Sequence, residues 1–248
     1  MTISRAGGPS AAGSAPATRP AHTLVIEAST YRASLAVLTE GSVVAELDVA
    51  TGGGRPDHDH LMPGVAAVME RAGIGVAALD RVVCGSGPGS FTSLRIAAAL
   101  GKGLVTPGGP RLAAVSSLLL IVAGAADRLA DGSYIASLDA LRGERHAVLV
   151  TVDRGAGASD TTPRSARMVV HDGARRLPVD AVTEWARAAG ATTIGPGCSV
   201  DAWPAARGVL RVWDAVRDVD VETWEPDYGR LAEAEVRRAA MFPSGPPG

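Results

Sequence analysis

The residues with the most chemical potential in this sequence lie in one glycine-rich stretch, VVCGSGPGSFTSLRIAAALGKGL, residues 82–104. Gly85, Gly87 and Gly89 occupy every second position of a short segment. This segment joins an apolar run typical of a strand to a run with helical spacing. Such a strand-to-helix turn presents free N–H groups at the positive end of a helix dipole, where anions bind. Three interpretations are open: a phosphate cradle, a nucleophile elbow, or a loop on which another surface docks.

The spacing within this stretch excludes the common nucleotide and hydrolase motifs. In a GxGxxG motif the third glycine would fall at Ser90, and Lys102 stands in Gly-Lys-Gly with no Ser or Thr after it, unlike a Walker motif. Ser86 lacks the GxSxG spacing of a nucleophile elbow. Cys84 ends an apolar strand and is expected to be a core residue. A tight turn that lets a helix pack closely on its strand remains an equal alternative.

Two side chains just after the glycines favour a contact with another group. Arg95 falls in the first turn of the predicted helix, where a cation opposes the helix dipole, so we expect a nearby carboxylate, a phosphate or a partner chain. Phe91 suits an interface if exposed. It equally suits a hydrophobic contact that fixes the start of the helix.

Charged groups elsewhere give little support for a metal site. Glu27 and Asp139 follow apolar strands and are the candidate cleft carboxylates. His58 and His60 form an HxH pair, and two residues at that spacing do not share a helical face. We therefore predict neither a metal nor a cofactor. The segment from Gly195 to Ser199, GPGCS, is a candidate second phosphate turn.

Composition limits the classes of protein further. The 248 residues carry a net charge of −2, so we expect any nucleic-acid role to be indirect. The two cysteines form no CxxC pair, and no apolar run is long enough for a membrane span, which favours the cytoplasm. Residues 1–21 and 242–248 are rich in Gly, Ser, Ala and Pro and are predicted to be a disordered tail and a flexible tail.

The hydrophobic pattern predicts two halves of similar order. The first is β-β-β-α-β-α-β-α, with strands at 24–26, two within 33–50, and at 79–84 and 111–115, and helices at 61–72, 92–104 and 116–130. We expect Gly73 to end the first helix and Ser116 or Ser117 to cap the third. The second half has strands at 133–140, 144–153, 167–172, 191–195 and 210–216, and a helix at 178–190. The predicted lobes are residues 22–130 and 131–241.

Residues 85–104, GSGPGSFTSLRIAAALGKGL, resemble the signature of the TsaB family, also called YeaZ. A looser similarity extends from about residue 22 to residue 126, through LVIEASTYRASLAVL, DHDHLMPGVAAVMERAGI and LAAVSSL. In the second half, SLDALRGERHAVLV and EPDYGRLAEAEVRRA are similar to family segments. Glu27, Ser93 and Leu141 depart from the family pattern.

The resemblance implies an α/β fold of the actin, sugar kinase and Hsp70 (ASKHA) class, with two lobes and a reduced second lobe. It also implies a noncatalytic, scaffold role beside a catalytic paralogue, TsaD, and an ATPase, TsaE. Together these proteins support transfer of a threonylcarbamoyl group to the tRNA adenosine beside the anticodon. Contact with tRNA would be indirect, through the complex.

Family members pair through helices of the first lobe, as homodimers or with the paralogue. The candidate interface and loop residues in this chain are Leu61, Val65, Met69, Gly87, Pro88, Gly89, Ser90, Phe91, Thr92, Leu94, Arg95, Ala98 and Gly101. For the residues on helices, burial against a sheet is the alternative, because each helix must cover a sheet with one face.

Two other functions remain open at this stage. A standalone ASKHA-type ATPase or phosphotransferase would use Glu27 and Asp139 in its cleft. A hydrolase would use Ser86, Ser90 or Cys84, although His22, His146 and His171 stand in no recognisable catalytic motif.

Overall fold

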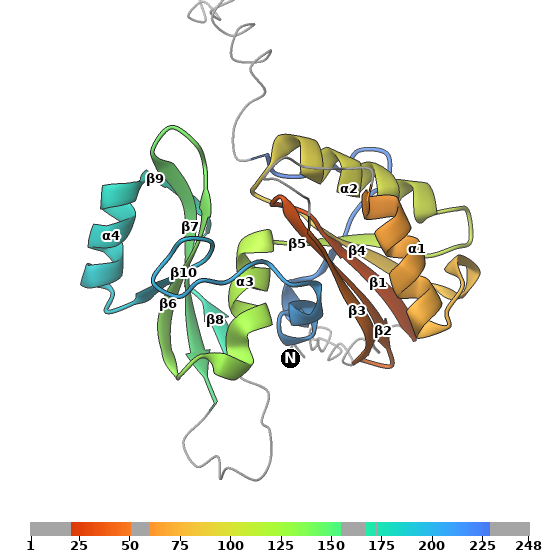
Figure 1. Ribbon diagram of the computed structural model, residues 1–248, viewed down its shortest axis with the longest axis horizontal. Helices are drawn as coiled ribbons and strands as arrows, with labels where there is room; N and C mark the ends of the chain where they lie inside the picture. Colours follow the sequence, from red (N-terminus) through yellow and green to blue (C-terminus); the bar gives the residue numbers. More distant parts are fainter. Residues whose placement is uncertain (1–20, 51–59, 155–166, 172, 229–248) are drawn as a thin grey trace, which may run out of the picture.

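The structure is a computed structural model that describes residues 21–50, 60–154, 167–171 and 173–228. It is a mixed α/β protein with two sheets (Figure 1). The first half has the predicted order β-β-β-α-β-α-β-α: β1 (His22–Glu27), β2 (Arg32–Thr39), β3 (Ser42–Ala50), α1 (Leu61–Ala72), β4 (Arg81–Gly85), α2 (Phe91–Leu104), β5 (Arg111–Val115) and α3 (Ser117–Ala125).

The first sheet has the strand order β11-β5-β4-β1-β2-β3. β1, β2 and β3 form an antiparallel meander, while β4 and β5 run parallel to β1. Alternate residues of β1 serve the two faces of this sheet: Leu24 and Ile26 belong to the core under α1 and α2, and Val25 to the core around α3.

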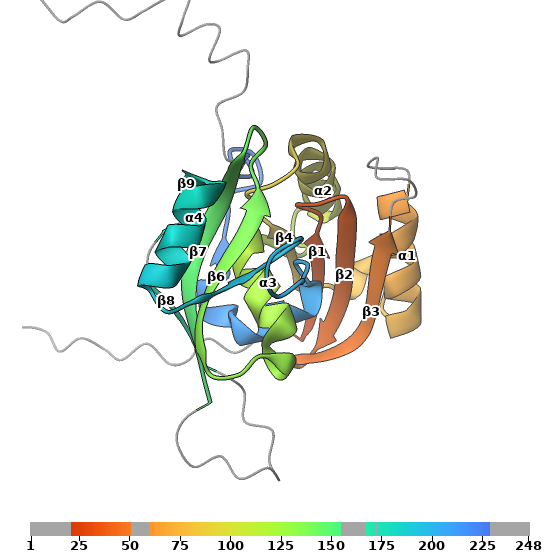
Figure 2. The ribbon, with the colours of Figure 1, turned by 60° about the vertical axis from the view of Figure 1, so that its left-hand side comes forward.

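The second sheet has the order β10-β6-β7-β8, with β9 also paired to β7. Its elements are β6 (Gly132–Asp139), β7 (Glu144–Asp153), β8 (Arg167–Val170), β9 (Arg175–Pro178), α4 (Val179–Ala188) and β10 (Thr192–Ile194). In Figure 2, α3 lies between the two sheets, α4 covers the outer face of the second sheet, and α1 and α2 cover the outer face of the first.

Local sequence explains the boundaries of the first two helices. Gly73 takes a left-handed conformation after α1, and its N–H donates to Glu70 O, as expected for a helix stop. The Ser90 hydroxyl accepts from the Ser93 N–H and caps α2. At α3 the prediction was wrong in part: Ser116 precedes the helix without a capping bond, and Ser117 uses its hydroxyl elsewhere.

The predicted strand at 210–216 was wrong. Two short 3-10 helices, η5 (Ala206–Arg211) and η6 (Trp213–Ala215), occupy this stretch, because Val209, Val212 and Val216 bury themselves at a spacing of three or four residues. β9 was missed, because its sequence, RRLP, is charged and exposed. The remaining short elements are η3 (Val76–Ala78), η4 (Ala126–Arg128) and β11 (Arg217–Asp218).

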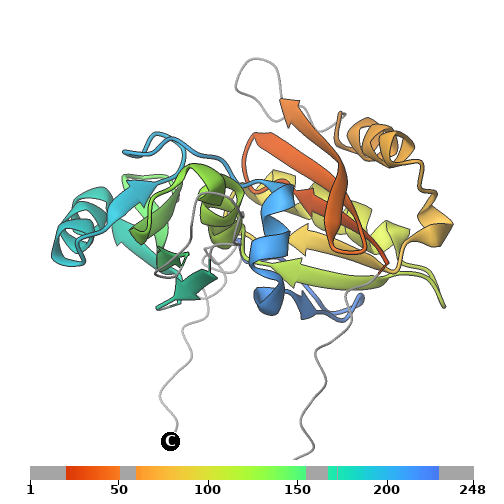
Figure 3. The same cartoon turned by 90° about the horizontal axis from the view of Figure 1, so that it is seen from below.

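The chain returns to the first sheet after β10. β11 pairs with β5, and η5 packs against α3, β1 and β2, as the view from below shows (Figure 3). Both elements fall within residues 131–241, the predicted second lobe. Both predicted tails, 1–21 and 242–248, fall outside the described residues apart from Ala21. No helix in the described ranges combines the length and the apolar character needed to cross a bilayer.

Candidate functional site

The three alternating glycines are each explained by a close approach within the protein. A Cβ on Gly85 would lie 1.9 Å from Glu27 Oε2, and one on Gly89 would lie 2.2 Å from Ser29 O. Gly87 has a positive φ of 88°, and its Cβ would lie 2.2 Å from Asp227 O. The glycines thus let the loop contact β1, the turn after it, and the segment around residue 227.

Most N–H groups of the loop are used inside the protein. The N–H groups of Ser86, Gly87 and Ser90 donate to Val115 O, Ser117 Oγ and Ser29 O, at 2.8, 3.1 and 2.7 Å. Within the described ranges, no acceptor is recorded for the N–H groups of Gly89, Phe91 and Thr92. The predicted anion-binding geometry is therefore reduced to the start of α2.

Glu27 is a buried acid behind the loop. Its carboxyl accepts from the Ser29 N–H at 2.6 Å and from the Ser117 hydroxyl at 2.8 Å. Burial raises the pKa of Glu27, and the bonds from Ser29 and Ser117 oppose that rise. The side chain ties β1 to the start of α3, so it acts as a structural anchor.

The candidate nucleophiles are held in unreactive surroundings. Cys84 is fully buried, and burial, with a smaller contribution from the charge on Glu27, raises the pKa of its thiol to about 12. The Ser86 hydroxyl donates to Val115 O at 3.1 Å. The Ser90 hydroxyl accepts from the Ser93 hydroxyl at 3.0 Å. Throughout the described part of the chain, no recorded hydrogen bond joins either serine to a histidine.

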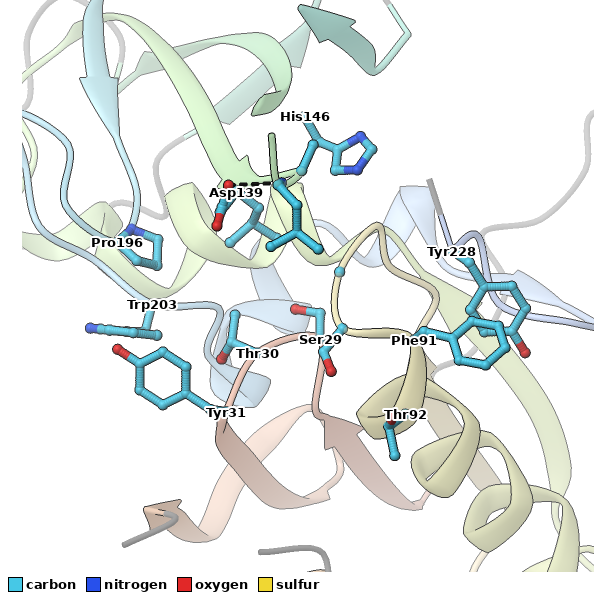
Figure 4. A pocket seen from close by; sticks show the side chains of 15 residues that line it. Ser29, Thr30, Tyr31, Phe91, Thr92, Asp139, His146, Pro196, Trp203 and Tyr228 are labelled. Carbon is cyan, nitrogen blue, oxygen red and sulfur yellow. Dashed lines mark hydrogen bonds between the residues drawn. The ribbon is translucent and has the colours of Figure 1, made fainter. Parts of the chain in front are cut away.

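A cavity of about 430 Å³ lies between the end of β1, the start of α2 and the end of β6. Figure 4 shows an aromatic pair at each end and Ser29 between the pairs. Tyr31 meets Trp203 edge to face with ring centroids 4.8 Å apart, and Phe91 meets Tyr228 at 4.7 Å. The cavity is thus walled by aromatic rings at both ends.

Asp139 and His146 line the cavity from the second sheet (Figure 4). Asp139 Oδ1 accepts from the Leu141 N–H at 2.9 Å. His146 is 7% exposed, and burial is the main cause that lowers its pKa, which favours the neutral ring. Leu141, where the sequence departs from the family pattern, has a positive φ of 64° in the tight turn after β6 and also lines the cavity.

The structure separates the predicted interface residues into two groups. Six of them are buried in the core and have almost no surface to give to a partner: Leu61, Val65, Met69, Leu94, Ala98 and Gly101. These six residues are therefore buried within the chain, which is the alternative to an interface role given by the sequence analysis. Pro88 is also buried, while Gly89, Ser90, Phe91 and Thr92 line the cavity.

Arg95 meets aromatic rings where the sequence predicted a carboxylate, phosphate or partner. Its guanidinium lies 4.2 Å from the centre of the Phe91 ring and 5.7 Å from that of Tyr228. Phe91 therefore forms a local packing cluster with Arg95 and Tyr228, which is closer to the helix-start alternative than to a free interface side chain.

The remaining candidates do not converge. His58 lies outside the described residues, and His60 is exposed just before α1. Among the residues that the structure describes, no group of three or more His, Cys, Asp or Glu could hold a metal ion. Gly195 begins a tight turn, since Cys198 N–H donates to its carbonyl, and only Pro196 of this turn lines the cavity.

Sequence reasoning gave no site role to several cavity residues, among them Ser29, Tyr31, Trp203 and Tyr228. Ser29 and Tyr31 come shortly after β1. Because Glu27 at the end of this strand is a candidate cleft carboxylate, the sequence did indicate that the residues after it could lie near the cleft. Trp203 and Tyr228 come from irregular segments with no periodic pattern, and only the folded chain places them on the cavity wall, at opposite ends.

The fold and a family match define the class of protein. A family model described as "TsaD: tRNA N6-adenosine threonylcarbamoyltransferase" matches residues 54–158. Two solved Pseudomonas aeruginosa structures have the same fold. One, described as an uncharacterized protein with similarity to peptidase YEAZ, has a TM-score of 0.69 at 24% identity, over 85% of this chain and 100% of the other. The second, YeaZ, has a TM-score of 0.63 at 22% identity, over 83% and 98%. The chain thus has an ASKHA-like fold.

Curated relatives narrow the class. The Escherichia coli protein named tRNA threonylcarbamoyladenosine biosynthesis protein TsaB is 27% identical over 121 residues, 49% of this chain and 51% of its own length. The Bacillus subtilis protein of the same name is 31% identical over 133 residues, 53% and 56% respectively. This chain spans about half the length of the curated relatives it matches. Together the matches support the TsaB/YeaZ family, as the glycine-rich stretch predicted.

Proposed function

We propose that this chain is a noncatalytic subunit of the complex that transfers a threonylcarbamoyl group to the tRNA adenosine beside the anticodon. Its partners would be a TsaD-like catalytic paralogue and a TsaE-like ATPase, and it would meet tRNA through the complex. The observation that carries this proposal is the similarity to relatives named for tRNA threonylcarbamoyladenosine biosynthesis.

The state of the candidate catalytic groups supports a noncatalytic role. Glu27 is buried and already bonded to Ser29 and Ser117, so its carboxyl has no open path to a metal or a water. Cys84 is buried and its pKa is raised, which removes the thiolate that a nucleophile needs.

The outward faces of α1 and α2 are the surface that we propose for the partner. Met62 is 65% exposed on α1, and Ala66, one turn further on, is exposed beside it. On α2 the exposed residues include Thr92, Ala99 and Gly103. These small residues allow close approach of a second helix. The same surface is proposed for a homodimer in the absence of the paralogue.

We also propose that the two sheets belong to two lobes, the second reduced, as in other ASKHA proteins, and that the complex is cytoplasmic. The proposed division falls at residue 130. The segment 206–218 belongs to the second lobe in sequence while it packs on the first sheet, and it would therefore join the two.

The cavity between the sheets favours a second candidate, a standalone ATPase or phosphotransferase. Against it, none of the described residues that line the cavity is Lys or Arg, and Asp139 adds a carboxylate. Polyphosphates are held in proteins mainly by cations and backbone N–H groups. ATP hydrolysis by the purified chain that disappears in Glu27→Ala would favour this second candidate.

The proposed role is tested by tagging the chain in its own organism and identifying co-purified proteins by mass spectrometry. We expect an actin-like paralogue and a small ATPase in near-stoichiometric amounts. Deletion should remove the threonylcarbamoyl group from tRNA, measured by mass spectrometry of nucleosides. A plasmid encoding Glu27→Gln should restore the modification. Loss of the partners from the purification, together with intact tRNA modification after deletion, would overturn the proposal.

A further inference from the structure

The cavity between the sheets contains a polar group with an unmet hydrogen-bonding need. Ser29 is 2% exposed, and its hydroxyl has no hydrogen-bond partner among the described residues. A buried hydroxyl without a partner costs folding free energy, so such groups are rare without a compensating role. Ser29 lies on the wall of a cavity of about 430 Å³, within the range of roughly 300–1,000 Å³ that is common for small-molecule sites.

The main chain of Ser29 is fixed on both sides of this hydroxyl. Its N–H donates to Glu27 Oε1 at 2.6 Å, and its carbonyl accepts from the Ser90 N–H at 2.7 Å. The turn is therefore held in place by a buried acid and by the loop before α2. The hydroxyl is preorganised on a rigid support, as binding sites require.

Further donors lie beside Ser29 at the start of α2. Phe91 and Thr92 line the same cavity, and their N–H groups have no recorded acceptor in the described part of the chain. They belong to the first turn of a 14-residue helix, where the helix dipole favours negative charge. One hydroxyl and two helical N–H groups together suit a carboxylate.

The opposite wall selects against highly charged anions. Asp139 reaches this wall from β6, and its Oδ1 accepts from the Leu141 N–H, which leaves Oδ2 with no recorded partner among the described residues (Figure 4). No Lys or Arg belongs to the described lining of the cavity. A second negative charge on a ligand would therefore meet a carboxylate with no cation to offset it, whereas an ammonium group would be attracted.

We propose that this cavity binds a small zwitterion, a free α-amino acid, with its carboxylate at Ser29 and the start of α2 and its ammonium at Asp139. The ligand side chain lies against the aromatic pairs Tyr31–Trp203 and Phe91–Tyr228. His146, kept neutral by burial, adds an uncharged hydrogen-bonding group to the same wall. This inference is independent of the proposed subunit role.

The first test is the melting temperature of the full chain with each of the proteinogenic L-amino acids added singly. At least one is expected to raise it, and calorimetry then gives the Kd of that amino acid. Its carboxamide and its analogue without the amino group should each bind at least about tenfold more weakly, because each lacks one charged pole. Absence of any stabilising amino acid overturns the proposal, and so does equal binding of the carboxamide.

Two variants locate the ligand. Ser29→Ala should weaken binding of the stabilising amino acid at least about tenfold. It should leave the unliganded melting temperature unchanged or higher, since the hydroxyl has no partner to lose among the residues that the structure describes. Asp139→Asn keeps the acceptor for the Leu141 N–H and should weaken binding through loss of charge. Ser133→Ala is the control, because that hydroxyl contacts Thr151 at the other end of β6.

Unchanged affinity in both Ser29→Ala and Asp139→Asn would place the amino acid elsewhere and overturn the proposal. Stabilisation by ATP or inorganic phosphate, without stabilisation by any amino acid, would overturn it as well and would favour the phosphotransferase candidate.

Discussion

The helices on the two faces of the first sheet are built differently. Every residue of α3, from Ser117 to Ala125, is buried, because this helix lies between the two sheets. In α1 and α2 five residues each are buried, and the other residues are partly buried or exposed. A helix that is apolar on all sides is a core element, whereas an amphipathic helix leaves a face for solvent or a partner.

This difference assigns separate tasks to the two faces. α3 joins the sheets, since its residues share one hydrophobic core with Val25 of the first sheet and Val150 of the second. α2 begins directly after the glycine-rich loop, and α1 and α2 present the surface that we propose for a partner. Substitutions in α3 should therefore affect stability alone, and substitutions on the outer face of α1 should affect assembly alone.

The largest expected effect is that of Leu120→Ala in α3. Leu120 is fully buried, so its truncation leaves a cavity between the sheets and should lower the free energy of unfolding by about 2–5 kcal/mol. Urea unfolding measures this value. Met62→Ala on α1 is the matched control, expected within about 0.5 kcal/mol of wild type. Equal losses in the two variants would remove the distinction between the faces.

The next effect concerns how closely α2 packs on β4. A Cβ on Gly101 would lie 2.4 Å from Cys84 Sγ, so Gly101→Ala should cost about 1–3 kcal/mol of stability. Gly103 lies on the same helix, and a Cβ added there would meet no described atom within 4 Å apart from the helix itself. Gly103→Ala should therefore stabilise the chain by about 0.4–1 kcal/mol.

Cys84→Ala tests the cause of the Gly101 effect. Combined with Gly101→Ala, it should recover part of the loss, because it removes the sulfur that the new methyl group meets. Independent, additive losses in the double variant would show that the strain arises elsewhere.

The first half of the fold could be predicted from the sequence because its signals are local. Apolar periodicity gave the order of strands and helices, Gly73 and Ser90 marked helix ends, and the segment 85–104 indicated the family. The stretch 206–216 could not be predicted as two 3-10 helices, because a short apolar run fits a strand and a helix equally.

The cavity and the exposed partner surface were less predictable. Leu61, Val65 and Met69 share one helical face, and sequence alone does not say whether that face meets the sheet or a partner. The cavity depends on Trp203 and Tyr228, which long-range folding brings to its wall. Tertiary contacts of irregular segments carry no periodic signal.

Glu27→Gln should produce a smaller, pH-dependent change. The folded-state pKa of Glu27 is raised above its ordinary value of 4.5, so ionisation is less favourable in the folded chain than in the unfolded one. The contribution of the Glu27 carboxyl to the free energy of unfolding of the wild type is fully present at low pH. This contribution is lost as the pH rises through the folded-state pKa of Glu27. Glutamine does not titrate.

The stability of Glu27→Gln relative to wild type should therefore increase between about pH 4.5 and neutral pH, measured by urea unfolding at several pH values. Glu70→Gln, an exposed position on α1, controls for the loss of one carboxyl group. A difference that shrinks as the pH rises would contradict the buried, raised-pKa state of Glu27.

The smallest effect on stability is expected for Met62→Asp on the outer face of α1. Because Met62 is 65% exposed, the free energy of unfolding of the Met62→Asp variant should stay within about 0.5 kcal/mol of wild type. Recovery of the actin-like paralogue in affinity purification should nevertheless fall, since a charge is placed in the proposed interface and must lose its water there. Val76→Asp, similarly exposed at 46% but outside both helices, is the control and should retain the partner. Equal recovery with both variants would move the partner surface away from α1, and the outward faces of these helices would then be ordinary solvated surface.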